Sequence, residues 1–342
     1  MKPASKILVV GPSWVGDMVM AQSLFISLKN NSPDCQIDVL APAWTFSLLD
    51  RMPEVHQAIA MPLSHGQLGL WERIQLGRQL RSEHYTQAIL LPNSWKSALS
   101  PYFANIPKRT GYIGECRWGL LNDARKLDKK RLPMTVQRFV ALGLPADAPL
   151  PPAYPIPALA IAAQQQQAVI DKFQLTRSLK TLALCPGAEY GPAKRWPVEY
   201  FAELAKAKLD QGWQVWIFGS EKDQAIAGQI NTAVGGFCAD FTGKTSLAEA
   251  VDLMSLVHVV VSNDSGLMHL AAALDKQVIA LYGSSDPTFT PPLNNKAQII
   301  SLGLDCSPCF KRDCPLGHTR CLTGIAPEQV LQHITITSAG RL

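Results

Sequence analysis

Residues 7–17 have the sequence ILVVGPSWVGD, in which a short β-branched run meets a turn that contains two glycines. The run at residues 7–10 predicts a buried strand, and a helix is expected from about Asp17 to Lys29. Parallel strands need a crossover connection, most often a helix, so a strand followed directly by a helix is typical of a parallel sheet. This stretch therefore favours an α/β fold.

The same alternation recurs in both halves of the chain. Strands are expected at residues 37–40, 88–91, 182–185, 215–218, 257–261 and 278–281, and helices at residues 70–81, 198–209, 248–256 and 266–274. Between the halves, residues 144–159 contain six prolines, too many for a helix or a central strand. A chain of 342 residues fits two domains. We expect two doubly wound domains on either side of this linker, with the ligand site in the cleft between them.

Composition excludes several classes of protein. With 47% hydrophobic and 17% charged residues the chain is typical of a globular protein. Its apolar runs are too short to span a bilayer, and the N-terminal run ends at Gly11-Pro12, too early for a signal peptide, so we expect a cytoplasmic protein.

The net charge of +5 is concentrated in one stretch of the chain, because nine basic and three acidic residues lie between Lys108 and Arg138. That stretch carries +6 and the rest of the chain −1.

The first loop lacks the residues of the common phosphate-binding motifs. After its second glycine it has Asp17 and Met18 where a P-loop needs Lys and Ser or Thr, and it lacks the third glycine of a dinucleotide site. Asp17 stands where a helix begins. It is either a helix-capping residue or a general base for a hydroxyl nucleophile, and these two interpretations have equal weight.

Two later loops carry groups suited to an anion. Lys194 and Arg195 precede a helix and could fix a phosphate, or they are solvated surface cations. After the strand at residues 257–261, the amides of Ser265 to Leu267 would point at an anion beside Gly266. His269 shares a helix face with Ser265 and has either a structural or a functional role.

Two further segments leave alternatives open. Glu221 follows a strand and could bind a nucleoside ribose or cap a helix. The chain has no Asp-X-Asp pair, so cations and helix dipoles, not a metal, are expected to hold a diphosphate. Cys306, Cys309, Cys314 and Cys321 only partly match zinc-ligand spacing, and reduced thiols or an adventitious disulfide are the favoured interpretations.

The motifs GPSWVGD (residues 11–17), PGAE (186–189) leading to KRWP (194–197), and NDSGLMH (263–269) resemble those of the family 9 glycosyltransferases. The resemblance implies a GT-B architecture with two Rossmann-like domains, residues 1–150 for the acceptor and 151–342 for an ADP-sugar. It also implies inverting transfer of L-glycero-D-manno-heptose from ADP-heptose to the first heptose of heptosyl-Kdo-lipid A in lipopolysaccharide. ADP-heptose is then a co-substrate, and no cofactor is implied.

The resemblance also implies roles for individual residues. Asp17 would be the base and Lys194 would stabilise the leaving diphosphate. The remaining donor-binding residues are Arg195, Glu221, Asp264, Ser265, Gly266 and His269, and the expected acceptor-binding residues are Ser13, Trp14, Lys129, Lys130 and Arg131. The alternatives are a nucleotide-sugar epimerase or another GT-B enzyme with a different donor, and a non-catalytic nucleotide-binding protein.

The same resemblance also implies which partner the basic stretch between Lys108 and Arg138 binds. A basic cluster is generally typical of nucleic-acid binding, but no nucleic-acid motif accompanies this one. A phosphorylated, carboxylate-bearing glycolipid fits it better, by electrostatic attraction at the cytoplasmic face of the inner membrane. We therefore expect peripheral membrane association and no nucleic-acid partner.

Overall fold

The computed structural model describes residues 5–63 and 66–334. The chain divides into two compact units, Met1–Ala160 and Ile161–Leu342, and each contains one parallel six-stranded sheet. The Pro-rich segment belongs to the first unit, because Ser23 Oγ donates to Pro155 O (2.7 Å) and Gln22 Nε2 to Ala158 O (2.8 Å). The boundary between the two units therefore lies after Ala160, ten residues beyond the boundary expected at residue 150.

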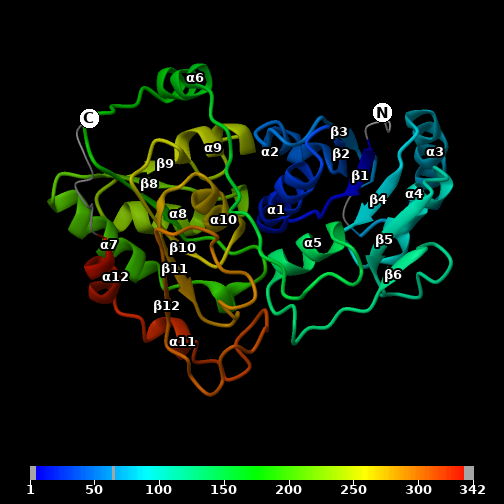
Figure 1. Cartoon of the computed structure of the whole chain (residues 1–342). Helices are drawn as coiled ribbons and strands as arrows, with labels where there is room; N and C mark the ends of the chain where they lie inside the picture. Colours follow the sequence, from blue (N-terminus) through cyan, green and yellow to red (C-terminus); the bar gives the residue numbers. More distant parts are fainter. Residues whose placement is uncertain (1–4, 64–65, 335–342) are drawn as a thin grey trace. The chain divides into compact units, whose positions relative to one another are not determined.

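The first unit has the strand order β3-β2-β1-β4-β5-β6 (Figure 1). Its strands are β1 (Lys6–Val10), β2 (Gln36–Ala41), β3 (Gln57–Ala60), β4 (Gln87–Leu90), β5 (Lys108–Tyr112) and β6 (Asp123–Arg125). Its helices are α1 (Val15–Asn31), α2 (Phe46–Leu49), α3 (Leu70–Gln79), α4 (Leu99–Phe103) and α5 (Thr135–Gly143), with short 3₁₀ turns η1 (Ala43–Thr45), η2 (Leu80–Glu83) and η3 (Trp95–Ala98). The order reverses direction at β1, which lies between β2 and β4.

Helices cover both faces of this sheet. Leu8 and Val10 of β1 pack with Leu76 and Leu80 on the α3 side, as expected when alternate residues of a strand share a face. Figure 1 shows α3 and α4 on one side of the sheet and α1 and α5 on the other, and each pair is in contact. A Cβ at Gly143 would lie 2.5 Å from Leu24 Cδ1, so the last residue of α5 must be small where it meets α1.

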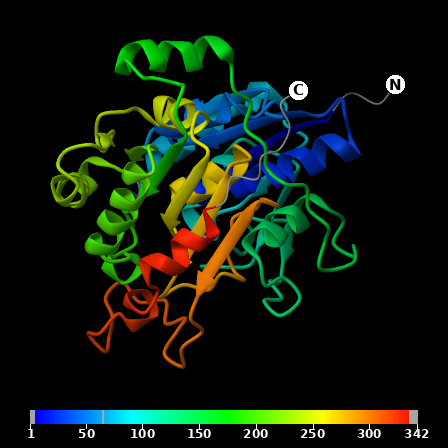
Figure 2. The ribbon, with the colours of Figure 1, turned by 90° about the vertical axis from the view of Figure 1, so that its left-hand side faces the viewer.

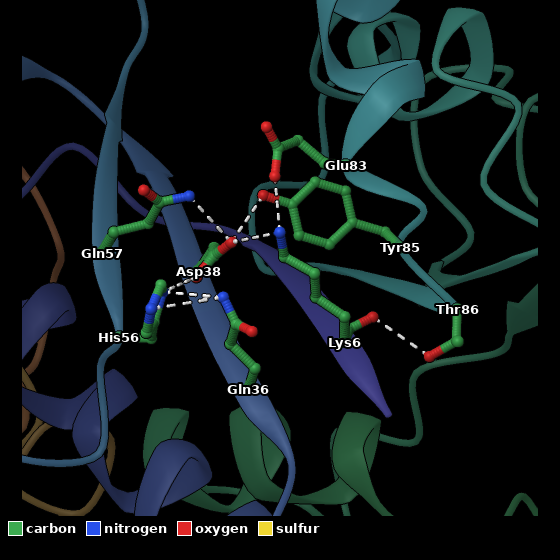
Figure 3. Close-up of polar contacts among 8 residues, drawn as sticks. All are labelled: Lys6, Gln36, Asp38, His56, Gln57, Glu83, Tyr85 and Thr86. Atoms are coloured by element: carbon green, nitrogen blue, oxygen red, sulfur yellow. Dashed lines mark hydrogen bonds and ion pairs between the residues drawn. The ribbon is translucent and has the colours of Figure 1, made fainter. Parts of the chain in front are cut away.

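A buried carboxylate ties the amino-terminal ends of four strands together (Figure 3). Asp38 of β2 has no exposed surface, and it accepts hydrogen bonds from Tyr85 OH (2.7 Å), Gln57 Nε2 (3.0 Å) and His56 Nδ1 (2.9 Å), while Lys6 Nζ lies 3.6 Å away. A buried charge is tolerated only when it is paired in this way. Burial, together with the Asp38 charge, raises the pKa of Tyr85 far above its ordinary range. These residues stabilise the sheet at the edge opposite the carboxyl ends of its strands.

The second unit has the strand order β12-β11-β10-β7-β8-β9 (Figure 1). Its strands are β7 (Thr181–Cys185), β8 (Gln214–Ile217), β9 (Ala239–Asp240), β10 (Val259–Asn263), β11 (Gln277–Tyr282) and β12 (Ala297–Ser301). Its helices are α6 (Ala163–Phe173), α7 (Val198–Asp210), α8 (Gln224–Ala233), α9 (Leu247–Met254), α10 (Gly266–Ala273), α11 (Arg320–Thr323) and α12 (Pro327–His333), with the 3₁₀ turns η4 (Pro192–Lys194) and η5 (Glu221–Asp223).

One face of the second sheet buries the side chains of three helices. Phe201 of α7, Ile230 of α8 and Val330 of α12 pack against Leu182 and Leu184 of β7. Figure 2 shows α12 (red) beside α7 (green), and the two helices are in contact. The C-terminal end of the described chain therefore completes the core of this unit.

The predicted α/β class is confirmed, and the predicted central strands form within two residues of their expected bounds. The first helix begins at Val15 instead of Asp17, and the strand expected from residue 257 begins at Val259. Five short strands had not been predicted: β3, β5, β6, β9 and β12. Among the described helices, none has the length and apolar character needed to cross a bilayer.

Candidate active site

The loops after β7, β8, β10 and β11 all leave the same edge of the second sheet, because the carboxyl ends of parallel strands lie together. The predicted donor-binding residues lie on three of these loops. Lys194 and Arg195 follow β7, Glu221 follows β8, and Asp264 and Ser265 follow β10. Loops at this edge are where open α/β sheets bind their ligands.

A buried ion pair stands at the centre of this edge. Lys194 Nζ lies 2.5 Å from Asp264 Oδ2, and the side chains are 19% and 6% exposed. The ammonium group also lies over the Tyr190 ring, 5.2 Å from its centroid. A buried pair with these contacts holds the lysine in one position, where its charge is available to an anionic group. The geometry thus favours the fixed phosphate contact over a solvated cation.

Asn263 is the first residue of the NDSGLMH motif, and its role becomes visible only in the structure. Its side chain is fully buried; Oδ1 accepts from Trp196 N (3.0 Å) and Nδ2 donates to Pro186 O (2.7 Å). The two bonds fix both ends of the loop that carries Lys194. An amide can do this because it offers a donor and an acceptor on one rigid group.

Helix α10 begins at this edge with its first turn uncapped by a side chain. Ser265 is the N-cap residue and makes no capping hydrogen bond; its Oγ lies 3.2 Å from Ser262 Oγ. Gly266 is the first helical residue. The amides of a first helical turn have no partner within the helix and favour an anion. This geometry supports the predicted use of Ser265 and Gly266 as diphosphate contacts.

His269 is a neutral group at neutral pH. It lies on α10 and is 5% exposed, and burial lowers its pKa to about 4, against a smaller opposing effect of the Asp264 charge. A neutral imidazole can donate one hydrogen bond and accept another. The lowered pKa therefore favours a neutral His269 imidazole over a cation at pH 7.

The pKa of His269 predicts how stability depends on pH. Between pH 6.5 and 4 the unfolded chain binds a proton at this site and the folded chain does not, so stability falls as the pH falls through this window. At pH 5 we expect the His269 contribution to be lower than at pH 7 by about 2 kcal/mol. Urea unfolding of the wild type and His269→Gln at the two pH values measures it. Equal losses in the two proteins would contradict it.

Two acidic residues follow β8, and they have different environments. Asp223 is buried and accepts from Ser220 N (2.9 Å) and Ser220 Oγ (2.8 Å), so it caps η5. A Cβ at Gly187 would lie 2.5 Å from the Asp223 carboxylate, so the loop after β7 approaches it closely. The side chain of Glu221 is exposed and makes no hydrogen bond or ion pair with the described residues. Capping is the role of Asp223, while ribose binding by Glu221 stays a prediction.

Buried polar atoms without partners gather on the same loops. Arg195 Nε, Ser284 Oγ and Ser285 Oγ are all buried and have no hydrogen-bond partner within the described chain. The two serines follow β11, and Arg195 follows β7. Such groups are rare in proteins because each costs free energy. Together they suit a ligand rich in oxygen atoms at this edge.

The cysteine-rich tail braces the loop that carries Lys194. Tyr190 OH donates to Phe310 O (2.8 Å), and Ala193 N donates to Arg312 O (2.9 Å). Four free thiols line one small cavity there: Cys306, Cys309, Cys314 and Cys321. Across residues 5–63 and 66–334, no three His, Cys, Asp or Glu side chains are placed so as to hold a metal ion.

In the first unit, Asp17 lies in the first turn of α1, beyond the carboxyl end of β1. The N-cap residue is Trp14, and Asp17 is the third residue of the helix. The capping interpretation of Asp17 stays a prediction. A carboxylate in the first turn of a helix interacts favourably with the helix dipole. Its role as a base stays a prediction, as does acceptor binding by Ser13 and Trp14 on the same loop.

Much of the basic stretch has a structural role. Arg109, Arg117, Arg125 and Arg138 are all at most partly exposed and donate to backbone carbonyls of the first unit. Lys108 is exposed and forms an ion pair with Asp123 (3.7 Å). The other exposed cations of the stretch lie on the loop after β6, which we call the basic loop: Lys126, Lys129, Lys130 and Arg131. They make no ion pair with any described residue. The charge available to a partner is therefore concentrated in the basic loop.

Comparison with known proteins gives a consistent result. Residues 73–320 match the model of glycosyltransferase family 9 (heptosyltransferase). The chain is 48% identical to lipopolysaccharide heptosyltransferase 2 of Salmonella typhimurium, over 96% of this chain and 97% of that protein, and 47% identical to the Escherichia coli protein of the same name, with the same coverage. The solved structure of E. coli ADP-heptose LPS heptosyltransferase II has a TM-score of 0.86 and 44% identity, covering 96% of this chain and 97% of that one. The predicted GT-B fold is thereby confirmed.

Proposed function

Since the chain belongs to glycosyltransferase family 9, the heptosyltransferases, we propose that it transfers L-glycero-D-manno-heptose from ADP-heptose to the first heptose of heptosyl-Kdo-lipid A. It is a glycosyltransferase enzyme of lipopolysaccharide core synthesis. The observation that carries the proposal is the buried Lys194–Asp264 pair, which lies at the ligand-binding edge of a sheet. Relatives that are nearly half identical over almost the whole chain are named lipopolysaccharide heptosyltransferase 2, which supports the proposal.

The second unit binds the donor in this proposal. Lys194, Arg195 and the first amides of α10 surround the diphosphate and stabilise the charge that develops on the leaving ADP. Asp264 holds Lys194 in place, and His269 contributes a hydrogen bond without a charge. Glu221 accepts hydrogen bonds from the ribose. Because these fixed cations and dipoles supply the positive charge, we propose that no metal is required.

The first unit binds the acceptor. Asp17 accepts the proton of the attacking hydroxyl as its oxygen bonds to the anomeric carbon of the donor. The bond from that carbon to the phosphate oxygen breaks on the opposite face, and the electron pair leaves with ADP. One displacement therefore inverts the anomeric centre. Ser13, Trp14 and the basic residues Lys129, Lys130 and Arg131 bind the acceptor.

The acceptor also determines where the enzyme works. Heptosyl-Kdo-lipid A is an anionic glycolipid held in a bilayer. The exposed basic loop suits an anionic surface, since basic side chains near a membrane are each attracted to anionic headgroups. We place the protein in the cytoplasm, in peripheral contact with the inner membrane.

Product analysis tests the function directly. The purified chain is incubated with ADP-heptose and heptosyl-Kdo-lipid A, with UDP-sugars as control donors, and the glycolipid is examined by mass spectrometry. We expect one added heptose from ADP-heptose and none from the UDP-sugars. Transfer from a UDP-sugar would identify a different donor, and tight ADP binding without any transfer would identify a nucleotide-binding protein.

Charge reversal tests the acceptor assignment. In the variant Lys129→Glu/Lys130→Glu/Arg131→Glu we expect the apparent KM for the acceptor to rise about tenfold, because a basic surface raises the local concentration of an anionic substrate. The KM for ADP-heptose stays unchanged, because the donor binds the other unit. Steady-state kinetics with each substrate varied in turn measures both constants. An unchanged acceptor KM would make the basic loop a merely solvated surface.

A further inference from the structure

The tryptophans of this chain are distributed unequally between its units. Five of the eight are between 37% and 68% exposed, and all five belong to the first unit: Trp14, Trp44, Trp71, Trp95 and Trp118. In the second unit, Trp196 and Trp216 are buried in the core. Large aromatic side chains usually bury most of their surface. The first unit therefore exposes an unusually large indole surface to solvent.

The exposed tryptophans all lie at one edge of the first sheet. Trp95 and Trp118 follow the carboxyl ends of β4 and β5, and Trp71 lies in the first turn of α3, the helix that follows β3. Leu68 and Leu70 beside Trp71 are each 47% exposed. We call the set Leu68, Leu70, Trp71, Trp95 and Trp118 the apolar rim.

Hydrogen bonds join the loops that carry the apolar rim. Lys96 Nζ donates to Gln67 O (3.2 Å), which ties the loop after β4 to the loop after β3. Trp95 N donates to Glu115 Oε2 (3.1 Å), and Arg117 NH1 donates to Pro92 O (2.7 Å), which tie it to the loop after β5. The three loops that carry the apolar rim are thus fixed to one another by hydrogen bonds.

The basic loop borders the apolar rim on one side and supplies positive charge there. The basic loop follows β6, the neighbour of β5 in the sheet, and therefore leaves the same edge as Trp118. Its four basic side chains and Asp128 carry a net +3. Glu72 and Glu115 are exposed acidic groups nearer the apolar rim, and Glu115 is engaged by the Trp95 amide. The surface thus has positive charge at the basic loop and indole rings at the apolar rim. This combination is typical of protein surfaces that bind at a membrane interface.

We infer that the apolar rim and the basic loop together form the surface by which this protein docks on an anionic lipid bilayer. The inference deepens the proposed function and rests on it for the reason to dock, because a lipid-anchored acceptor must be met at the bilayer. The tryptophan rings lie at the level of the lipid headgroups. There the apolar part of each ring contacts lipid and its N–H group can donate a hydrogen bond. The basic loop pairs with anionic headgroups.

The residue types favour lipid over the sugar rings of the acceptor. Leu68 and Leu70 are aliphatic and offer no hydrogen bond to a hydroxyl group and no flat face for a sugar ring. Both gain free energy on leaving water for the acyl boundary. A contiguous exposed apolar surface with a charged border is typical of membrane and partner sites.

Vesicle binding of the full chain, with neither substrate present, tests the inference. Sedimentation with vesicles of phosphatidylethanolamine and phosphatidylglycerol is compared with phosphatidylcholine vesicles. We expect wild-type binding to the anionic vesicles only, weakened about tenfold or more in Trp71→Ala/Trp118→Ala, because two interfacial anchors are lost. The matched control is Phe237→Ala, which removes an aromatic side chain 76% exposed on the second unit, and it should bind like the wild type.

A kinetic arm separates lipid from sugar contacts. With acceptor embedded in anionic vesicles the tryptophan double variant should show a raised KM, and with a deacylated, soluble acceptor its KM and kcat should equal those of the wild type. Wild-type protein that fails to bind anionic vesicles, or a variant that binds them undiminished, overturns the inference. Equal losses on both acceptors overturn it too, and assign the indoles to the sugar. A wild type that docks but transfers no heptose refutes the proposed function alone.

Discussion

Asp17→Asn should reduce turnover by about 10²–10⁴-fold, the usual contribution of a general base. The amide has the size of the carboxylate but cannot take the proton of the attacking hydroxyl. ADP binding should be little changed, because the donor groups belong to the other unit. Single-turnover rates with ADP-heptose, together with ADP titration by calorimetry, separate the two effects.

The matched control for this variant is Asp34→Asn. Asp34 lies in the exposed turn between α1 and β2, so the same chemical change there should leave rate and affinity as in the wild type. Near-normal turnover in Asp17→Asn would eliminate Asp17 as the base. Helix α1 would then owe its acidic first turn to the helix dipole alone.

Lys194→Ala should weaken ADP-heptose binding and lower kcat by about 10²–10³-fold, as expected when one charge-stabilising group is removed from a transition state. The variant also leaves Asp264 buried without its ion pair, which costs about 3–5 kcal/mol of stability in comparable pairs. Folding and function therefore have to be measured separately. Urea unfolding gives the first, and donor-varied kinetics at a temperature where the variant is folded give the second.

A double variant removes that ambiguity. Lys194→Met/Asp264→Asn takes away both charges and should recover much of the stability while the rate stays low. Lys206→Ala, which breaks the exposed Lys206–Asp210 pair on α7, is the control and should change stability by less than about 1 kcal/mol. Normal donor binding and rate in the double variant would move the phosphate contact to another residue.

Central strands could be predicted from the sequence because they are buried on both faces. β7 and β11 are runs of mainly apolar residues, and such runs are typical of strands in a parallel sheet that is covered on both faces. The edge strands carry no such pattern: β6 is Asp-Ala-Arg and β9 is Ala-Asp. Pairing with a neighbouring strand, not composition, makes these segments extended.

The candidate site was predictable to the extent that it lies in loops after strands. The positions of Lys194, Asp264 and Ser265 follow from the parallel sheet alone. The sequence could not predict which hydrogen-bond or ion-pair partner each polar side chain has. Asn263 holds a loop 67 residues distant, and Arg117 is buried, although counting charges includes it in the basic stretch. Such roles depend on contacts between segments far apart in the chain.

The Asp38 cluster has a consequence for redesign. It joins β1, β2, β3 and the segment before β4 at the amino-terminal edge of the first sheet, while every loop proposed to meet the acceptor or the bilayer leaves the carboxyl edge. The scaffold and the recognition surface can therefore be altered independently. Grafting the loops after β1 and β6, which carry the proposed acceptor-binding residues, from a relative with another acceptor should exchange the acceptor that is recognised while the host sheet keeps its melting temperature.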